Sequence, residues 1–254
     1  MTQIEEFYRD YWEIGIDQWC PAGESISAFE RSLLGPYLSK APKVLDFGCG
    51  DGAHIGEYIA SADCEYTGVD VSEAAVSSCT RKGLAARICL PDRPLPFTPE
   101  RFDLIVSFEV LEHLFAPADA ILELNRVLRQ GGHFVGSVPN CVAIGNRLLT
   151  LFGYFNAAGA PRTSLYRPWL DPHIRFFTRS ALWRFLEEAG FRVIGVSGPP
   201  FSLLQLPWIH RASGSVRRTV EAVSRPLAAI TRLWPALFAY RLYFVAQKPL
   251  DAHL

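Results

Sequence analysis

A glycine-rich loop, DFGCGDG at residues 46–52, is the first feature of the sequence that could do chemistry. Its glycines allow a sharp backbone turn, and they let a ligand lie against the chain without a Cβ atom in the way. The loop follows a short apolar run and precedes a helical pattern. The free N–H groups at the start of that helix would favour an anionic ligand group. The alternative is a structural turn capped by an aspartate.

An acid follows the loop at the place where a nucleoside would need it. Asp70 ends the next apolar run, and a carboxylate there can accept both hydroxyls of an adenosine ribose. Gly48, Gly50 and Ala53 also fit the G-x-G-x-x-A spacing of dinucleotide-binding units. A nicotinamide oxidoreductase therefore stays open as an alternative. Asp46, two residues before the first glycine, favours a methyl donor instead.

The elements that must hold these residues alternate between strand and helix. Short apolar runs indicate buried strands, and helical patterns lie between them, which predicts a doubly wound, mostly parallel α/β sheet. The strands are expected at 43–47, 66–70, 86–89, 102–108, 133–138, 191–196 and 238–247, and the helices between them at 53–60, 72–81, 118–128 and 180–190. Gly131 and Gly132 are expected to end the third of these helices.

The remaining segments predict additions to this sheet. Residues 1–40 are expected to form an N-terminal helical cap, with an aromatic helix at 4–19 and a second helix at 24–39. Residues 41–254 then form the main domain. Two apolar insertions, at about 140–175 and 199–235, are expected on the substrate side: the first begins with a helix, and the second is irregular and partly helical.

Composition excludes several classes of protein. The net charge of −1 argues against nucleic acid as a partner, although residues 200–254 carry a net charge of +5. The six cysteines show no CxxC spacing, so neither a metal site nor a disulfide framework is expected. No signal peptide and no membrane-spanning run are recognisable, which favours a cytoplasmic protein. The oligomeric state is not predictable.

Three motifs together carry a resemblance to a known family. DFGCGDG, then GVDVS, then LPFTPERFDLIVSFEVLEHL resemble the class I S-adenosylmethionine (SAM)-dependent methyltransferases, most of all the small bacterial type 11/12 group. The resemblance is firm over residues 44–138 and weaker up to about residue 196. It implies SAM as cofactor and a Rossmann-like seven-stranded sheet whose last strand runs antiparallel.

The resemblance also implies a set of cofactor-binding residues. The loop would hold the amino-acid end of SAM, the acid after the second strand its ribose, the next residue its adenine, and the end of the fourth strand would border the donor. These residues are Asp46, Gly48, Cys49, Gly50, Asp70, Val71, Phe108 and Glu109. One departure concerns the adenine amino group, because Leu90 stands where many relatives have an acid. Asp92 is the candidate substitute.

Histidine is the expected catalytic group if the acceptor is a hydroxyl, which must lose a proton during methyl transfer. His173, in DPHIRFF, lies in the loop expected to cover the carboxyl ends of the strands, and Asp171 would orient it. His113, in FEVLEHL, is the second candidate. For both residues, a purely structural role is the alternative.

The insertions suggest the acceptor. DPHIRFFT and the arginine-containing apolar tail resemble those of bacterial methyltransferases of glycan and secondary-metabolite pathways. This resemblance implies a hydroxyl on a sugar, glycan or secondary-metabolite intermediate, which a phosphate- or lipid-linked carrier could hold. The same basic segment, about 200–235, would allow peripheral contact with a membrane. A quinone-type or other small aromatic hydroxyl is the rival acceptor. A non-catalytic SAM-binding partner is the third alternative.

Overall fold

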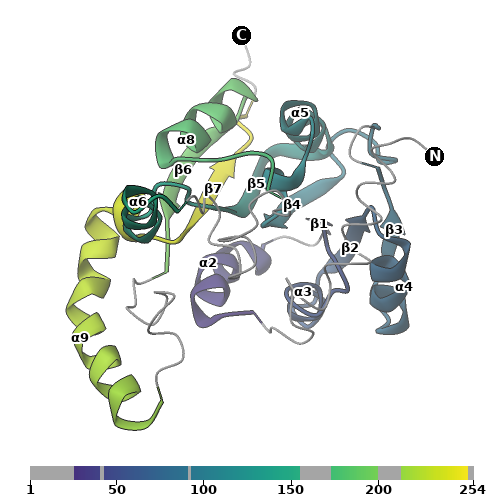
Figure 1. The fold of residues 1–254 in the computed structure, drawn as a ribbon. Helices are drawn as coiled ribbons and strands as arrows, with labels where there is room; N and C mark the ends of the chain where they lie inside the picture. Colours follow the sequence, from purple (N-terminus) through teal and green to yellow (C-terminus); the bar gives the residue numbers. More distant parts are fainter. Residues whose placement is uncertain (1–25, 41–42, 91–92, 155–172, 200–212, 251–254) are drawn as a thin grey trace.

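A computed structural model describes residues 26–40, 43–90, 93–154, 173–199 and 213–250 (Figure 1). The expected aromatic helix at 4–19 lies outside these residues, as do Asp92 and Asp171.

Within the described residues, seven strands form a single sheet in the order β3-β2-β1-β4-β5-β7-β6. They are β1 (Lys43–Phe47), β2 (Glu65–Asp70), β3 (Ala86–Ile88), β4 (Phe102–Phe108), β5 (Leu128–Pro139), β6 (Arg192–Ser197) and β7 (Arg241–Gln247). Only β7 runs antiparallel to its neighbours, which are β5 and β6. The expected doubly wound sheet with an antiparallel last strand is confirmed.

Helices cover both faces of the sheet (Figure 1). One apolar cluster packs α2 (Ala28–Leu38), α3 (Gly56–Ala60) and α4 (Glu73–Arg81) on one face. The other packs α5 (Pro117–Val127) and α8 (Arg179–Glu188) on the opposite face. Because both faces are covered, a central strand such as β4 is apolar on both sides, which is why FDLIVSF reads as one continuous run.

The strand order reverses between β1 and β4, on either side of which the chain winds in opposite directions. In open parallel sheets, ligands bind outside the carboxyl ends of the strands at such a point. The glycine loop follows β1 there, and the residues after β4 lie next to it.

The glycine pair at 131–132 is a correction to the sequence expectation. It does not end a helix, because α5 already ends at Val127 and β5 begins at the next residue. The pairing of β4 with β5 shifts its register at this point. Gly131 has a φ of +72°, and its N–H donates to the carbonyl of Lys248. The pair therefore forms a strand irregularity, a role that glycine serves as readily as a helix end.

Other boundaries also differ from the expectation. Helix α3 begins at Gly56 rather than at residue 53, because a turn follows the glycine loop. Strand β7 begins at Arg241 because the one-turn helix α10 (Pro235–Phe238) occupies the start of the expected strand. The first insertion contains α6 (Ile144–Leu151), and the second contains one long helix, α9 (Gly214–Leu233).

The described part of the N-terminal cap is α2, which packs against the sheet. Ser27 and Glu30 form a reciprocal capping box at its start, as the side-chain types at that spacing favour. Leu34 and Leu38 are buried in the core, and the ring of Phe29 meets the edge of Tyr243 in β7 at 5.0 Å. The cap is thus fixed to the antiparallel strand of the sheet.

Candidate methyl-donor and acceptor site

The glycine loop is held tightly between β2 and the segment after β4. The N–H groups of Gly48 and Cys49 both donate to the carbonyl of Val69, at 2.8 and 3.0 Å. Gly48 has a φ of +79°, and a Cβ atom there would lie only 2.4 Å from Cγ2 of Val110. Gly50 also has a positive φ, +54°. This loop therefore requires glycine for its turn and for its close approach to Val110.

Asp70 is aimed by the backbone around it. Its two carboxylate oxygens accept from the N–H groups of Gly50 and Ser72, each at 2.9 Å. Burial raises the pKa of Asp70 to about 6, although these backbone hydrogen bonds oppose the rise. Each oxygen keeps a further lone pair, so the carboxylate can still accept two hydroxyl groups.

Asp46 lies in β1 just before the loop and is also buried. One of its oxygens accepts from the hydroxyl of Tyr66 at 2.9 Å. Burial raises the pKa of Asp46 to about 7, and the Tyr66 hydrogen bond limits the rise. Tyr66 is a partner that the sequence reasoning missed, since nothing in the motif marks a tyrosine at the start of β2.

The other expected donor-binding residues lie at the same edge of the sheet. Cys49 is buried behind the loop, and Val71 is half-buried directly after Asp70. Phe108 ends β4, and Glu109 follows it with a φ of +56°, in the left-handed region. Their contacts with SAM stay predictions, as do the roles expected for Asp46, Gly48, Gly50 and Asp70.

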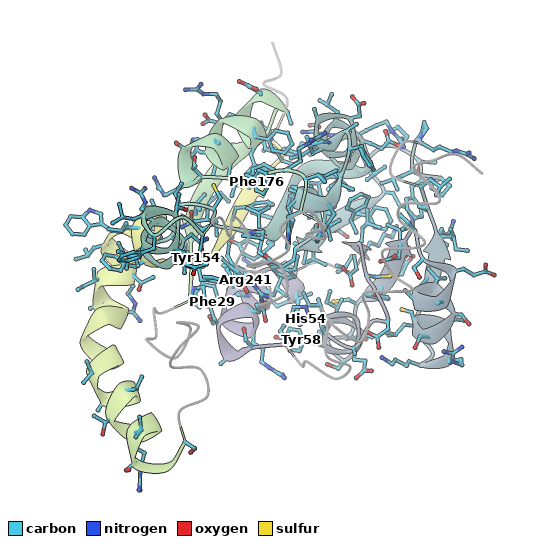
Figure 2. All side chains as sticks on the ribbon, in the orientation of Figure 1. Phe29, His54, Tyr58, Tyr154, Phe176 and Arg241 are labelled. Carbon is cyan, nitrogen blue, oxygen red and sulfur yellow. The ribbon has the colours of Figure 1, made fainter. Side chains whose placement is uncertain are left out.

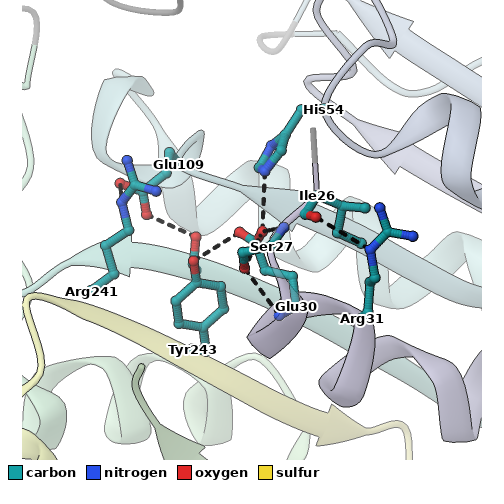
Figure 3. A network of polar contacts seen from close by, with 9 residues as sticks. Ile26, Ser27, Glu30, Arg31, His54, Glu109, Arg241 and Tyr243 are labelled. Carbon is teal, nitrogen blue, oxygen red and sulfur yellow. Dashed lines mark hydrogen bonds and ion pairs between the residues drawn. The ribbon is translucent and has the colours of Figure 1, made fainter. Parts of the chain in front are cut away.

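Glu109 is fixed in this strained conformation by its side chain. One oxygen accepts from the hydroxyl of Ser137 at 2.7 Å. The other accepts from Nε of Arg241 at 3.1 Å (Figure 3). Its own N–H donates to the carbonyl of Ser137. Neighbouring strands β5 and β7 thus hold the residue that follows β4.

A second polar group joins the cap to this site. Buried Glu30 in α2 accepts from the hydroxyl of Tyr243 at 2.8 Å and lies 3.3 Å from Nε2 of His54 (Figure 3). Burial alone would raise the pKa of Glu30, but hydrogen bonds from His54 and Ser27 lower it to about 2. In Figure 2, the labelled His54 and Arg241 come from the loop before α3 and from β7.

The two candidate histidines are brought together although they are far apart in sequence. His113 lies in the 3₁₀ turn η1 (Leu111–His113), and its ring stacks on that of His173 with centroids 4.6 Å apart. The N–H groups of Ile174 and Arg175 both donate to the carbonyl of Glu112, at 3.0 and 2.9 Å. These two hydrogen bonds hold the segment of His173 against η1.

Glu112 lies beside the two histidines, with Oε1 3.9 Å from Nε2 of each, and its position was not predicted from the sequence. The residue is completely buried, and neither carboxylate oxygen has a hydrogen-bond partner in the described part of the chain. Burial raises the pKa of Glu112 well above its usual range, and the charge of Glu109 adds to the effect. The signal was present in FEVLEHL, where an acid lies next to the candidate histidine.

The fold and this donor-side loop define a class of protein, and comparison with known proteins agrees. Residues 22–196 match the family described as "Methyltransferase domain". The chain belongs to this family, the class I SAM-dependent methyltransferases, and its cofactor is SAM. The nicotinamide alternative is therefore set aside.

Two relatives resemble this chain in sequence, and one solved structure resembles it in fold. A "Probable S-adenosylmethionine-dependent methyltransferase" of Mycolicibacterium smegmatis is 31% identical over 59% of this chain and 52% of its own. A "Ubiquinone biosynthesis O-methyltransferase" of Coxiella burnetii is 24% identical over 76% and 85%. The chain spans about half the length of the curated relatives that it matches first. A SAM-dependent methyltransferase from Archaeoglobus fulgidus shares the fold, with a TM-score of 0.60, 17% identity and coverage of 87% and 92%.

The raised pKa values of Asp46 and Asp70 predict how SAM affinity depends on pH. The ribose hydroxyls need the Asp70 carboxylate in its ionised form, so affinity should fall as pH drops below about 6, approaching tenfold per pH unit. Protonation of Asp46 begins near pH 7 and should add to the loss if this carboxylate contacts the donor. Calorimetric titration with SAM between pH 8 and pH 5 checks this.

The raised pKa values of Asp46 and Asp70 favour the folded protein at low pH, whereas they weaken SAM binding there. A raised folded-state pKa means that the folded protein prefers the protonated carboxyl. This stabilisation is fully present below about pH 4 and is lost as pH rises through about 6 to 7. Added SAM should restore stability at pH 8 more than at pH 5. Equal SAM affinity at both pH values would contradict the assignment of Asp70.

Proposed function

We propose that this protein transfers the methyl group of SAM to a hydroxyl oxygen of a flat, quinone-type acceptor. The observation that carries the proposal is the pair of stacked imidazoles: His113 lies in the segment that follows Glu109, and His173 comes from the segment bonded to it. Val110 packs on Gly48 of the donor loop, so His113, three residues after Val110, follows directly on a contact with the expected donor site.

The chemistry asks little of the protein beyond alignment and removal of a proton. A lone pair of the hydroxyl oxygen forms the new bond to the methyl carbon, and the electrons of the carbon–sulfur bond return to sulfur. The hydroxyl proton leaves, and S-adenosylhomocysteine is released. An imidazole at His173 or His113 is suited to assist this proton loss, with His173 as the primary candidate.

The choice of acceptor rests on the relatives. Several that match this chain bear the name ubiquinone biosynthesis O-methyltransferase, at 24 to 32% identity. None of the reported relatives supports the sugar or glycan acceptor that the insertions suggested, so the aromatic hydroxyl, first a rival, becomes the leading candidate. A phenolic hydroxyl also loses its proton far more readily than a sugar hydroxyl, which fits imidazole assistance.

Methyl-labelled SAM and two acceptors test the proposal: a substituted catechol and a reducing sugar. We expect label on an oxygen of the catechol and none on the sugar. His173→Ala should lower turnover of the catechol by about 10²- to 10⁴-fold while SAM affinity stays within about threefold. His133→Gln is the matched control, because His133 lies in β5 and its ring contacts that of Tyr37 rather than the candidate site. Near-normal turnover by His173→Ala would rule out a catalytic role for this residue.

Contact with a membrane stays a proposal of lower rank. The described part of the basic segment is α9, where Val216, Arg218 and Val223 are exposed. No helix in the described ranges is long and apolar enough to cross a bilayer. Peripheral binding would be seen as sedimentation with anionic vesicles, and Arg218→Ala together with Arg232→Ala should weaken it. Binding unchanged by these substitutions would reject the idea.

A further inference from the structure

We propose that Glu112, His113 and His173 bind a divalent transition-metal ion beside the methyl-donor site. Their candidate ligand atoms all lie within 4.8 Å of one another. Two imidazoles and one carboxylate suit zinc, and they are also the ligand types of non-haem iron sites. The earlier expectation of no metal rested on the cysteines, which take no part in this cluster.

The distances fit shared coordination better than direct hydrogen bonding. Oε1 of Glu112 lies 3.9 Å from Nε2 of His113 and also 3.9 Å from Nε2 of His173. A separation of 3.9 Å is too long for a hydrogen bond. Two ligands of one ion, each about 2.1 Å from it, lie roughly 3.0 to 3.5 Å apart, so small side-chain rotations suffice to bring all three into coordination.

Burial gives a second, independent argument. The side chain of Glu112 is 1% exposed, and those of His113 and His173 are 14% and 11% exposed. Neither oxygen of Glu112 has a hydrogen-bond partner among the described residues. A buried carboxylate is costly unless it is paired or coordinates a metal. A cation between the carboxylate and the two imidazoles would offset this cost.

The backbone holds the three ligands in place. Glu112 and His113 are successive residues of η1, and the segment after His173 is fixed to the carbonyl of Glu112 by two backbone hydrogen bonds. Farther along this segment, Phe177 pairs with Asn140 after β5 and accepts the N–H of Cys141. The backbone hydrogen bonds to the carbonyl of Glu112 therefore keep His173 close to Glu112 and His113.

The proposed ion would deepen the proposed function, on which its catalytic role rests. A divalent ion with three protein ligands would keep an open position, where it would lower the pKa of a bound oxygen group. In this arrangement, His113 and His173 would act as ligands, and the proton of the acceptor hydroxyl would pass to solvent water rather than to a free imidazole. Glu109 and Arg241, paired with each other, supply no net charge to the site.

Cobalt binding tests the site without SAM or acceptor. Untagged protein, stripped with a chelator, is titrated with Co²⁺ while its visible absorption is followed. We expect one Co²⁺ per chain, with the absorption bands of a protein-bound ion, and competition by Zn²⁺. His173→Ala and Glu112→Gln should each weaken binding by more than about tenfold. His133→Gln and Glu188→Gln, on an exposed position of α8, are the matched controls.

The outcomes separate the site from the function. If wild-type protein binds Co²⁺ no more tightly than His173→Ala, the metal site is wrong, and a bridging water is the better account of the cluster. SAM binding shows that each variant is folded, and His113→Ala replaces Glu112→Gln if the latter fails this check. Metal binding without methylation of a hydroxyl would reject the proposed function and keep the site. Equal turnover before and after chelation would reject the catalytic role of the ion.

Discussion

Asp70→Ala is expected to weaken SAM binding at least about 100-fold. The carboxylate is expected to accept both ribose hydroxyls, and hydrogen bonds to a charged group contribute about 1.5 to 3 kcal/mol each. The substitution also frees the N–H groups of Gly50 and Ser72, which the carboxylate now holds at 2.9 Å. The loss should therefore combine missing contacts with a less ordered glycine loop. Calorimetric titration with SAM measures it.

A matched acid and a measurement of folding make this result specific. Asp119→Asn changes an exposed acid in the first turn of α5 and should leave SAM affinity within about twofold. Thermal unfolding without SAM shows whether Asp70→Ala is folded, and Asp70→Asn, which keeps the side-chain size, serves if it is not. A variant at position 70 that is folded and binds SAM within threefold of wild type would contradict the donor site.

Gly48→Ala is expected to cost about 2 to 4 kcal/mol of stability and more than tenfold in SAM affinity. The new Cβ would lie 2.4 Å from Cγ2 of Val110, and the backbone φ of +79° adds a penalty of about 1 to 2 kcal/mol for any residue with a Cβ. Relief of the clash must move either the donor loop or the segment that leads to Glu112. Chemical denaturation and SAM titration measure the two effects.

Gly83→Ala distinguishes the cost of a positive φ from the cost of the clash with Val110. Gly83 follows α4 with a φ of +81°, but a Cβ atom there meets nothing within 4 Å. It should lose only the backbone penalty and keep normal SAM affinity. The double variant Gly48→Ala with Val110→Ala should recover the part of the loss that comes from the clash. If Gly48→Ala and Gly83→Ala behave alike, close packing of the loop against Val110 is not important.

The sheet and the donor loop could be predicted because their signals are local. Strands buried on both faces are continuous apolar runs, and the expected bounds of β1 and β4 are the observed ones. The order of strand, glycine loop, helix, strand and acid places Asp70 beside Gly50, and the structure shows that contact. Gly131 and Gly132 were misinterpreted because glycine serves both helix ends and strand irregularities, and only the partner strand decides between them.

The groups around Glu109 and Glu112 could not be predicted because their contacts are not local. Arg241 comes from the last strand and Glu30 from the cap, and their partners Glu109 and Tyr243 meet them only after the sheet closes. The acid of Glu112 is visible in the sequence. The proximity of both His113 and His173 to this carboxylate could not be read from the sequence. It results from the backbone hydrogen bonds between η1 and the segment after His173.

The proposed transfer of the methyl group of SAM to a hydroxyl is measured most directly by following label from methyl-labelled SAM. Wild-type protein, Asp70→Ala and His173→Ala are each incubated with a substituted catechol, and the products are separated by mass. We expect label on a catechol oxygen with wild type, and at least about 100-fold less with either variant. Bound SAM whose label reaches no oxygen of the acceptor, or equal transfer by all three proteins, would contradict it.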